Sequence, residues 1–258
     1  MIKNIIVVAS GKGGVGKSTV AVNLSVSLSL SKNLKVGLLD ADIYGPSIPQ
    51  MLNIKEKPTA SKNKKMLPYN NFFIKSISIG NMIPDDKAVI WRGAMASSAI
   101  RQMLNDVEWG DLDFLIIDLP PGTGDIQLSL CQNLKINGAV IVSTPQQVAL
   151  LDVKKAINMF KKVNVPILGL IQNMSYFEIN EKKNYIFGKN GALDESTKQN
   201  IKFLGDIPII PEVSVSGDNG QPLTSKKNTF FYKIFSKITQ ELLVSIENEK
   251  NSAVKINN

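Results

Sequence analysis

Residues 11–18 read Gly-Lys-Gly-Gly-Val-Gly-Lys-Ser and match the pattern G-x-x-x-x-G-K-[ST] of a phosphate-binding loop. The apolar run Ile5–Ala9 precedes this stretch and predicts a buried strand, whereas the periodic run Val20–Leu30 after it predicts a helix. Strand, glycine-rich turn and helix form the context in which such a loop binds phosphate. The stretch therefore predicts an α/β fold built around a nucleotide-binding loop.

The residue types in this loop suit a polyphosphate. Glycines let successive backbone N–H groups turn toward one anion because no Cβ blocks the approach, and the following helix contributes its positive N-terminal end. We expect Lys17 to neutralise the β- and γ-phosphates of a nucleotide and Ser18 to ligate Mg²⁺. The expected nucleotide-binding residues are Gly11, Gly13, Gly14, Val15, Gly16, Lys17, Ser18 and Thr19.

Composition narrows the chemistry that the chain can perform. Its 258 residues are 43% hydrophobic and 20% charged, which is typical of a globular protein with a sizeable core. The net charge of +8 favours anionic partners such as nucleotides, although it also fits an ordinary lysine-rich soluble protein. There are no histidines and the only cysteine is Cys131, so histidine acid–base chemistry and an intramolecular disulfide are excluded. The groups left to carry out any catalysis are carboxylates, lysines, backbone dipoles and a bound cation.

Short apolar runs alternate with helical patterns along the chain and predict a doubly wound, mainly parallel sheet with helices on both faces. We expect one P-loop NTPase domain over residues 1–246 and a frayed tail over 247–258. The expected strands are Ile5–Ala9, Lys35–Asp40, Phe72–Ile79, Asp113–Asp118, Gly138–Ser143, Ile167–Ile171 and Lys202–Ile207. The expected helices are Val20–Leu30, Ala94–Leu104, Val148–Val163 and Phe230–Ile246.

Acidic residues follow two of the predicted strands. Asp40 and Asp42 come at the end of KVGLLD and just after it, and Asp118 ends DFLIID. Because ligands of doubly wound sheets bind beyond the carboxyl ends of the strands, we expect these carboxylates near the phosphate loop. Without histidine, an aspartate has to position the attacking water. Asp40 is equally compatible with helix capping or a turn.

Two further segments have the composition of switch loops and one of a base pocket. Tyr44–Ser47 follows Asp42, and Pro120–Asp125 follows the second acidic strand, where a γ-phosphate could order the loop through the backbone of Gly122. Asn173 follows the predicted strand Ile167–Ile171, and its amide offers the donor and acceptor that pair with an adenine edge. The guanine-reading motif N-K-x-D is absent, which favours ATP over GTP.

With its extra lysine, K-G-G-V-G-K-S-T resembles the deviant Walker A class of ATPases, which includes the nitrogenase iron protein, MinD and ParA. The residues alone show only that Lys12 lies close to the phosphates. The resemblance implies a homodimer in which Lys12 reaches the partner's nucleotide, Asp42 positions the attacking water, and Asp118 holds Mg²⁺ through water. The expected catalytic residues are then Lys12, Lys17 and Asp42, and the expected metal site comprises Ser18, Asp42 and Asp118.

Longer motifs narrow the resemblance to the Mrp family of ATP-binding iron–sulfur cluster carriers. They occur in order from residue 10 to about residue 223: GKGGVGKST, DADIYGPSIP, WRGAM, DFLIIDLPPGTGD, STPQQVALLDVKKA, NMSYF and GDIPIIPEVSVSGDNGQPL. This resemblance implies a homodimeric, Mg²⁺-dependent ATPase that holds a bridging [4Fe–4S] cluster and passes it to apo iron–sulfur proteins.

The chain departs from that family just after NMSYF, where members usually carry C-x-x-C. Residues 178–184 contain neither cysteine, and a [4Fe–4S] cluster needs four thiolates. Cys131 lies in a predicted helix, where we expect it to be buried as a small hydrophobic residue, although a dimer could bring two copies together. Whether a cluster binds is left open.

Two other functions remain compatible with the sequence. A ParA- or MinD-like switch could dock on DNA or membrane through basic surface such as Lys55–Lys65. The apolar face of the predicted C-terminal helix, however, favours packing in the core over insertion into a membrane. We do not expect nucleic acid to be a partner. A regulatory or scaffold ATPase could have kept the switch and lost the cluster. No run reaches the length of a membrane span, so we expect a cytoplasmic protein.

Overall fold

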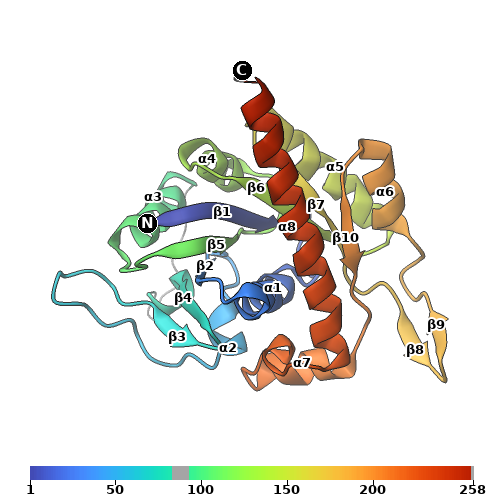
Figure 1. The fold of residues 1–258 in the computed structure, drawn as a ribbon, viewed down its shortest axis with the longest axis horizontal. Coiled ribbons are helices and arrows are strands. Elements are labelled where there is room, and N and C mark those ends of the chain that lie inside the picture. Colours follow the sequence, from blue (N-terminus) through green and yellow to red (C-terminus); the bar gives the residue numbers. More distant parts are fainter. Residues whose placement is uncertain (83–92, 257–258) are drawn as a thin grey trace.

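One eight-stranded sheet runs through the computed structural model, which describes residues 1–82 and 93–256 (Figure 1). Its strand order is β10-β7-β6-β1-β5-β2-β4-β3. Every neighbouring pair is parallel except β3 and β4, which confirms the predicted fold class. The strands of this sheet are β1 Ile2–Ala9, β2 Val36–Asp40, β3 Tyr69–Asn71, β4 Ile74–Ser78, β5 Leu112–Asp118, β6 Gly138–Ser143, β7 Ile167–Gln172 and β10 Phe203–Asp206.

Helices cover both faces of the sheet, and each face has its own core (Figure 1). Successive residues of β1 alternate between these cores: Ile6 and Val8 pack with α1 and α8, whereas Val7 and Ala9 pack with α3, α4 and α5. This two-sided burial explains why Ile5–Ala9, the second part of the strand, is a continuous apolar run. The helices are α1 Lys17–Lys32, α2 Ile48–Met51, α3 Gly93–Asp106, α4 Asp125–Asn133, α5 Gln147–Lys162, α6 Gly191–Gln199, α7 Pro211–Asp218 and α8 Phe230–Ile256.

Several elements differ from those predicted. The expected strand Phe72–Ile79 begins only at Ile74, because Phe72 and Phe73 have φ values of 50° and 67° and form the turn between β3 and β4. Helix α8 continues to Ile256, ten residues beyond its predicted end, so the expected frayed tail is helical over residues 247–256. Residues 247–252 of this extension are polar and exposed, so the helix continues past the residues that it buries.

Other elements were missed from the sequence. A protruding hairpin of β8 Phe177–Ile179 and β9 Lys182–Asn184 follows β7, and α6 and α7 lie beyond it (Figure 1). The lysine-rich segment Lys55–Lys65 is mainly exposed and closes through a bridge between Ala60 and Met66. Within the motif WRGAM, Trp91 and Arg92 lie outside the described residues.

The register of the central strands places the loops that matter. β5 lies between β1 and β2, and all three are parallel, so their carboxyl ends meet at one edge of the sheet. Asp40 at the end of β2 is paired with Asp118 at the end of β5. The glycine-rich loop leaves β1 at the same edge and enters α1. The sheet therefore brings together the loop and the two acidic strand ends.

Candidate nucleotide site

The glycine-rich loop connects β1 to α1 in a shape that needs glycine at specific positions. Gly14 and Gly16 have φ values of 78° and 80°, in the left-handed region that favours glycine. A Cβ on Gly16 would lie 2.2 Å from Nδ2 of Asn173, and a Cβ on Gly11 would lie 2.3 Å from the carbonyl carbon of Asp152 in α5. Close packing against two neighbouring segments therefore fixes the loop in front of the α1 N-terminus.

Lys17 is buried at the centre of the site and contacts both predicted acidic partners. Its Nζ lies 2.7 Å from Asp118 Oδ1 and 3.4 Å from Asp42 Oδ2, and 3.5 Å from Ser18 Oγ. Burial opposes the charge on Lys17, but the charge and hydrogen bond of Asp118, helped by Asp42, hold the pKa of Lys17 above its usual value. The structure thus brings together four residues, Lys17, Ser18, Asp42 and Asp118, that were predicted from three separate motifs.

One carboxylate oxygen of Asp118 has no hydrogen-bond partner in the described part of the chain. This oxygen is Oδ2, and the side chain is fully buried. Burial raises the pKa of Asp118 even though Lys17 favours its charged form. A buried acceptor without a partner is costly, so this oxygen suits a cation or a metal-bound water, and the Ser18 side chain lies near enough to interact with the same carboxyl group. Asp118 and Ser18 therefore fit the Mg²⁺ that accompanies a nucleotide.

Asp40 lies next to these groups but does not contact Lys17 directly. Burial and the neighbouring charge of Asp118 raise the pKa of Asp40 to about 7. One of its oxygens accepts a hydrogen bond from the backbone N–H of Ile48, the first residue of α2. Its other oxygen accepts a hydrogen bond from the Asp42 N–H, so the Asp40 carboxylate at the end of β2 supports both the turn that follows and the first residue of α2.

Two loops flank the phosphate loop where the sequence predicts switches. In the first, Asp42 Oδ1 accepts hydrogen bonds from the N–H groups of Tyr44 and Gly45, and the Tyr44 side chain is exposed. In the second, the Gly122 N–H donates to the carbonyl of Ser10. A contact from Gly122 to a γ-phosphate therefore requires this loop to exchange that hydrogen bond.

A cavity of about 570 Å³ opens beside the phosphate loop and is large enough for a nucleoside. Its lining is mostly apolar and includes Gly16, Thr19, Asn173, Pro208 and Phe235. Asn173 lines this cavity, but its Nδ2 also donates to the carbonyl of Val15, 2.8 Å away. The amide therefore supports the phosphate loop, a role that the sequence did not reveal, as well as facing the cavity expected to take the base.

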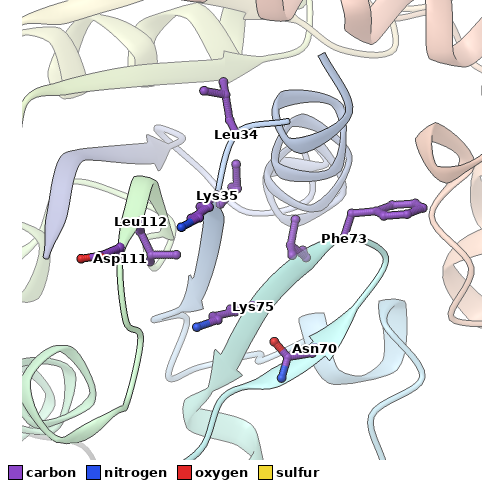
Figure 2. A pocket seen from close by; sticks show the side chains of 9 residues that line it. Leu34, Lys35, Asn70, Phe73, Lys75, Asp111 and Leu112 are labelled. Atoms are coloured by element: carbon purple, nitrogen blue, oxygen red, sulfur yellow. The ribbon is translucent and has the colours of Figure 1, made fainter. Parts of the chain in front are cut away.

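A second cavity of about 460 Å³ lies at the opposite end of the strands (Figure 2). It is lined by residues near the starts of β2 and β4, among them Lys35 and Lys75, and by Asn70 of β3. Lys75 Nζ already donates to the carbonyl of Trp109, and Asp111 pairs with the N-terminal ammonium. Its distance from the phosphate loop and these internal contacts favour the first cavity for a nucleotide.

Lys12 and Cys131 have contrasting environments. The Lys12 ammonium lies on the loop and forms no ion pair with any residue in the described part of the chain.

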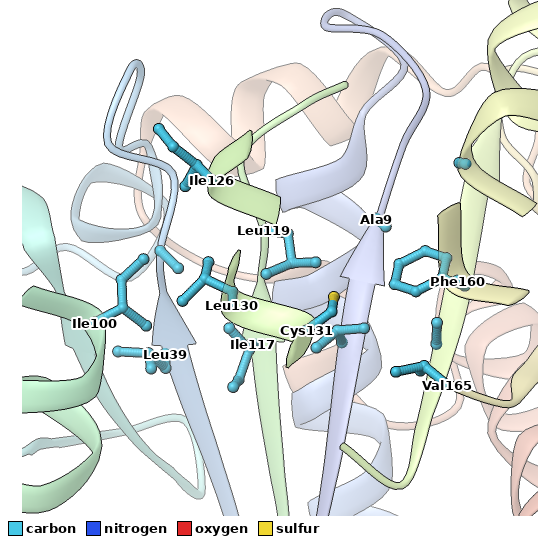
Figure 3. Packing of buried hydrophobic residues seen from close by; sticks show 14 of the residues in the cluster. Ala9, Leu39, Ile100, Ile117, Leu119, Ile126, Leu130, Cys131, Phe160 and Val165 are labelled. Atoms are coloured by element: carbon cyan, nitrogen blue, oxygen red, sulfur yellow. The ribbon is translucent and has the colours of Figure 1, made fainter. Parts of the chain in front are cut away.

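Cys131 packs in α4 among apolar side chains, and its burial raises the pKa of the thiol to about 12 (Figure 3). In residues 1–82 and 93–256 there is no group of three or more His, Cys, Asp or Glu side chains arranged to hold a metal ion.

Comparison with known proteins decides the family. Residues 1–243 match the model of a family described as "ParA: NUBPL iron-transfer P-loop NTPase". The chain belongs to this family. As a NUBPL-type iron-transfer P-loop NTPase, it carries the nucleotide-binding fold and motifs that its sequence predicts. In the described part of this P-loop NTPase, no helix combines the length and apolar character needed to cross a bilayer.

Relatives of this NUBPL-type NTPase cover nearly the whole chain. It is 48% identical over 250 residues to "Iron-sulfur protein required for NADH dehydrogenase, mitochondrial" of Arabidopsis thaliana, covering 95% of this chain and 80% of the relative. It is also 48% identical over 255 residues to an iron–sulfur cluster carrier protein of Aquifex aeolicus, covering 97% and 70%. A solved nucleotide-binding protein of Archaeoglobus fulgidus in complex with ADP is 38% identical, with a TM-score of 0.78 over 91% of this chain and 92% of that one.

Proposed function

We propose that this NUBPL-type NTPase is a Mg²⁺-dependent ATPase that acts as a homodimer in the transfer of iron–sulfur clusters to apo-proteins in the cytoplasm. The observation that carries the ATPase proposal is the buried contact of Lys17 with Asp118 and Asp42 at the mouth of a glycine-rich loop. The part in cluster transfer rests on the iron-transfer family and on relatives named as cluster carriers.

Nucleotide binding follows from the loop and its surroundings. The backbone N–H groups of residues 11–18 and the α1 N-terminus would surround the phosphates, and Lys17 would exchange its contacts with the aspartates for contacts with phosphate oxygens. Ser18 and Asp118 are the protein groups that would hold Mg²⁺, which would neutralise developing charge on the phosphates. The apolar cavity beside Asn173 would take the base.

Hydrolysis needs an oriented water more than a strong base. The water oxygen forms a bond to the γ-phosphorus while the bond from that phosphorus to the β–γ bridging oxygen breaks, giving ADP and phosphate. Asp42 is held between Lys17 and the N–H groups of its own loop, where it can orient that water. Lys12 would stabilise charge on the partner's phosphate across the dimer. With a carboxylate as the only base, we expect slow turnover.

The cluster is the cargo in this proposal, and the chain lacks the usual thiolates for it. The β8–β9 hairpin lies at the end of NMSYF and just after it, where the family resemblance implies a C-x-x-C segment, and Cys131 is buried. Cluster transfer would then need ligands from a client or from a second carrier. The test is anaerobic reconstitution of the full chain with iron and sulfide, with and without an apo-client, followed by visible absorbance and iron analysis. Absence of bound iron in repeated trials with both arms would exclude the carrier role.

A regulatory or scaffold ATPase is the second candidate, and the cysteine-free hairpin favours it. Such a protein would hydrolyse ATP and bind a client of iron–sulfur assembly without carrying iron. Nucleotide-dependent capture of the client by iron-free protein distinguishes this function from carriage. A membrane-docking role has less support, because Phe231, Phe235 and Leu242 on the apolar face of α8 are buried in the core rather than available to a membrane.

A further inference from the structure

Asp40 is a buried carboxylate that the proposed reaction does not use. Its side chain is 0% exposed, and its strand position is paired with that of Asp118, a second buried carboxylate. Two neighbouring buried acids of the same charge oppose each other and cost folding free energy. The hydrogen bonds that the two Asp40 oxygens accept offset part of this cost.

Three donors converge on the Asp40 carboxylate. Oδ1 accepts a hydrogen bond from the Asp42 N–H at 3.1 Å. Oδ2 accepts hydrogen bonds from the Ile48 N–H at 3.3 Å and from the Ser78 hydroxyl at 2.8 Å. The two backbone donors flank the first switch loop, Tyr44–Ser47: Asp42 precedes the loop, and Ile48 begins α2 directly after it. One side chain thus anchors both ends of that loop.

The end of β4 supports the same loop from behind. Besides donating to Asp40, Ser78 accepts a hydrogen bond from the Gly80 N–H. A Cβ on Gly80 would lie 2.8 Å from Cβ of Pro46 in the switch loop, so this glycine allows close backbone packing there. The rear of the loop is therefore fixed by packing, while its front carries Asp42 toward Lys17.

From this geometry we propose that Asp40 is a positioning residue for hydrolysis: its carboxylate ties the Asp42 and Ile48 amides together and so sets the Asp42 side chain against the nucleotide. The inference rests on the proposed ATPase function. Asp40 acts through Asp42 and has no contact with Lys17 among the described residues. It therefore affects the chemical step more than nucleotide binding, because the phosphate loop keeps its own supports at Asn173 and Asp152.

Asp40→Asn tests the proposal with little change in shape. Asparagine has one acceptor oxygen, so it can serve either Asp42 or Ile48 but leaves the other amide facing an NH₂ group. The variant also removes one of two opposed buried charges, so we expect its melting temperature to be no lower than that of the wild type. Asp113→Asn is the matched control, because it makes the same change at the opposite end of β5, where the Asp113 carboxylate accepts a hydrogen bond from the Lys35 N–H.

Three quantities are measured on the full chain: the kcat of steady-state ATP hydrolysis, the affinity for ADP by calorimetry, and the rate of hydrogen exchange in peptides 41–51 and 11–19. For Asp40→Asn we expect kcat to fall by about 10- to 100-fold, since small misplacements of reacting groups cost this much. ADP affinity should stay within about threefold of wild type, a difference well under 1.4 kcal/mol. Exchange should quicken in peptide 41–51 and not in 11–19, and Asp113→Asn should keep kcat within about threefold of wild type.

The outcomes separate this inference from the proposed function. Wild-type kcat in Asp40→Asn, or a parallel loss of kcat, ADP affinity and melting temperature, overturns the positioning role. If the wild-type chain hydrolyses no ATP, the proposed function fails, and the exchange data still decide the anchoring: unchanged exchange of peptide 41–51 in Asp40→Asn refutes it.

Discussion

Replacing Lys17 by methionine should destabilise the protein, and by an amount that depends on pH. The change removes the cation that lies 2.7 Å from Asp118 and 3.4 Å from Asp42, while keeping a side chain of similar length. Leaving a buried partner uncompensated costs about 3–5 kcal/mol. A domain of this size loses roughly 2–4 °C of melting temperature per kcal/mol, so the expected drop at pH 8 is about 6–20 °C.

The pH dependence has a definite sign. Burial already raises the pKa of Asp118 in the folded protein, and removal of Lys17 raises it further. A carboxyl group whose folded pKa is raised stabilises the fold fully below its unfolded pKa and loses that contribution as pH rises through the folded pKa. The melting-temperature deficit of Lys17→Met should therefore be smaller at pH 5 than at pH 8.

Thermal unfolding followed by circular dichroism at both pH values provides the assay. Lys12→Met is the matched control, because it removes a lysine of the same loop that has no ion-pair partner in the described part of the chain, and its melting temperature should stay near that of the wild type. Calorimetry should show that Lys17→Met no longer binds ATP although it folds. Equal deficits at pH 5 and pH 8, or none at pH 8, would refute the reasoning about the buried pair.

Three further variants or reagents test separate parts of the site. Lys12→Ala should lower ATP turnover more than ADP affinity, because its proposed contact forms across the dimer in the transition state; equal losses in both measurements would contradict that role. Asn173→Ala removes a hydrogen bond to the Val15 carbonyl worth about 1 kcal/mol and should weaken ADP binding several-fold in a calorimeter, and unchanged affinity would count against the support of the loop. The Cys131 thiol, with its pKa raised to about 12, should react with a thiol reagent at pH 8 only when the protein is unfolded by denaturant, and rapid stoichiometric labelling of the folded chain would show that it is accessible.

The sequence predicted most of the central elements because their signals are local. Gly138–Ser143 was placed with its observed bounds, since a short apolar run between turn residues leaves few alternatives. The hairpin β8–β9 and helix α7 were missed. The two strands of the hairpin have only three residues each, and the side chains of α7 are weakly patterned and partly exposed, so neither segment gives a clear periodic signal. Contacts between segments that are distant in sequence, such as the bridge between Phe177 and Ile209, stabilise this region instead.

What the sequence determined by itself is the identity of the chemical groups: a glycine-rich loop, a lysine, a serine and aspartates at strand ends, with no histidine. These follow from local spacing, which is written along the chain. Only the tertiary structure decided what those groups do to one another. The pairing of β2 with β5 brings Asp40 beside Asp118, the pairing of β5 with β1 brings Asp118 to Lys17, and Asn173 reaches back to Val15. In this buried site Asp40 and Asp118 repel each other, whereas Lys17 and Asp118 attract. The strength of these interactions depends on the distance between the charges and on the exclusion of water, not on sequence order.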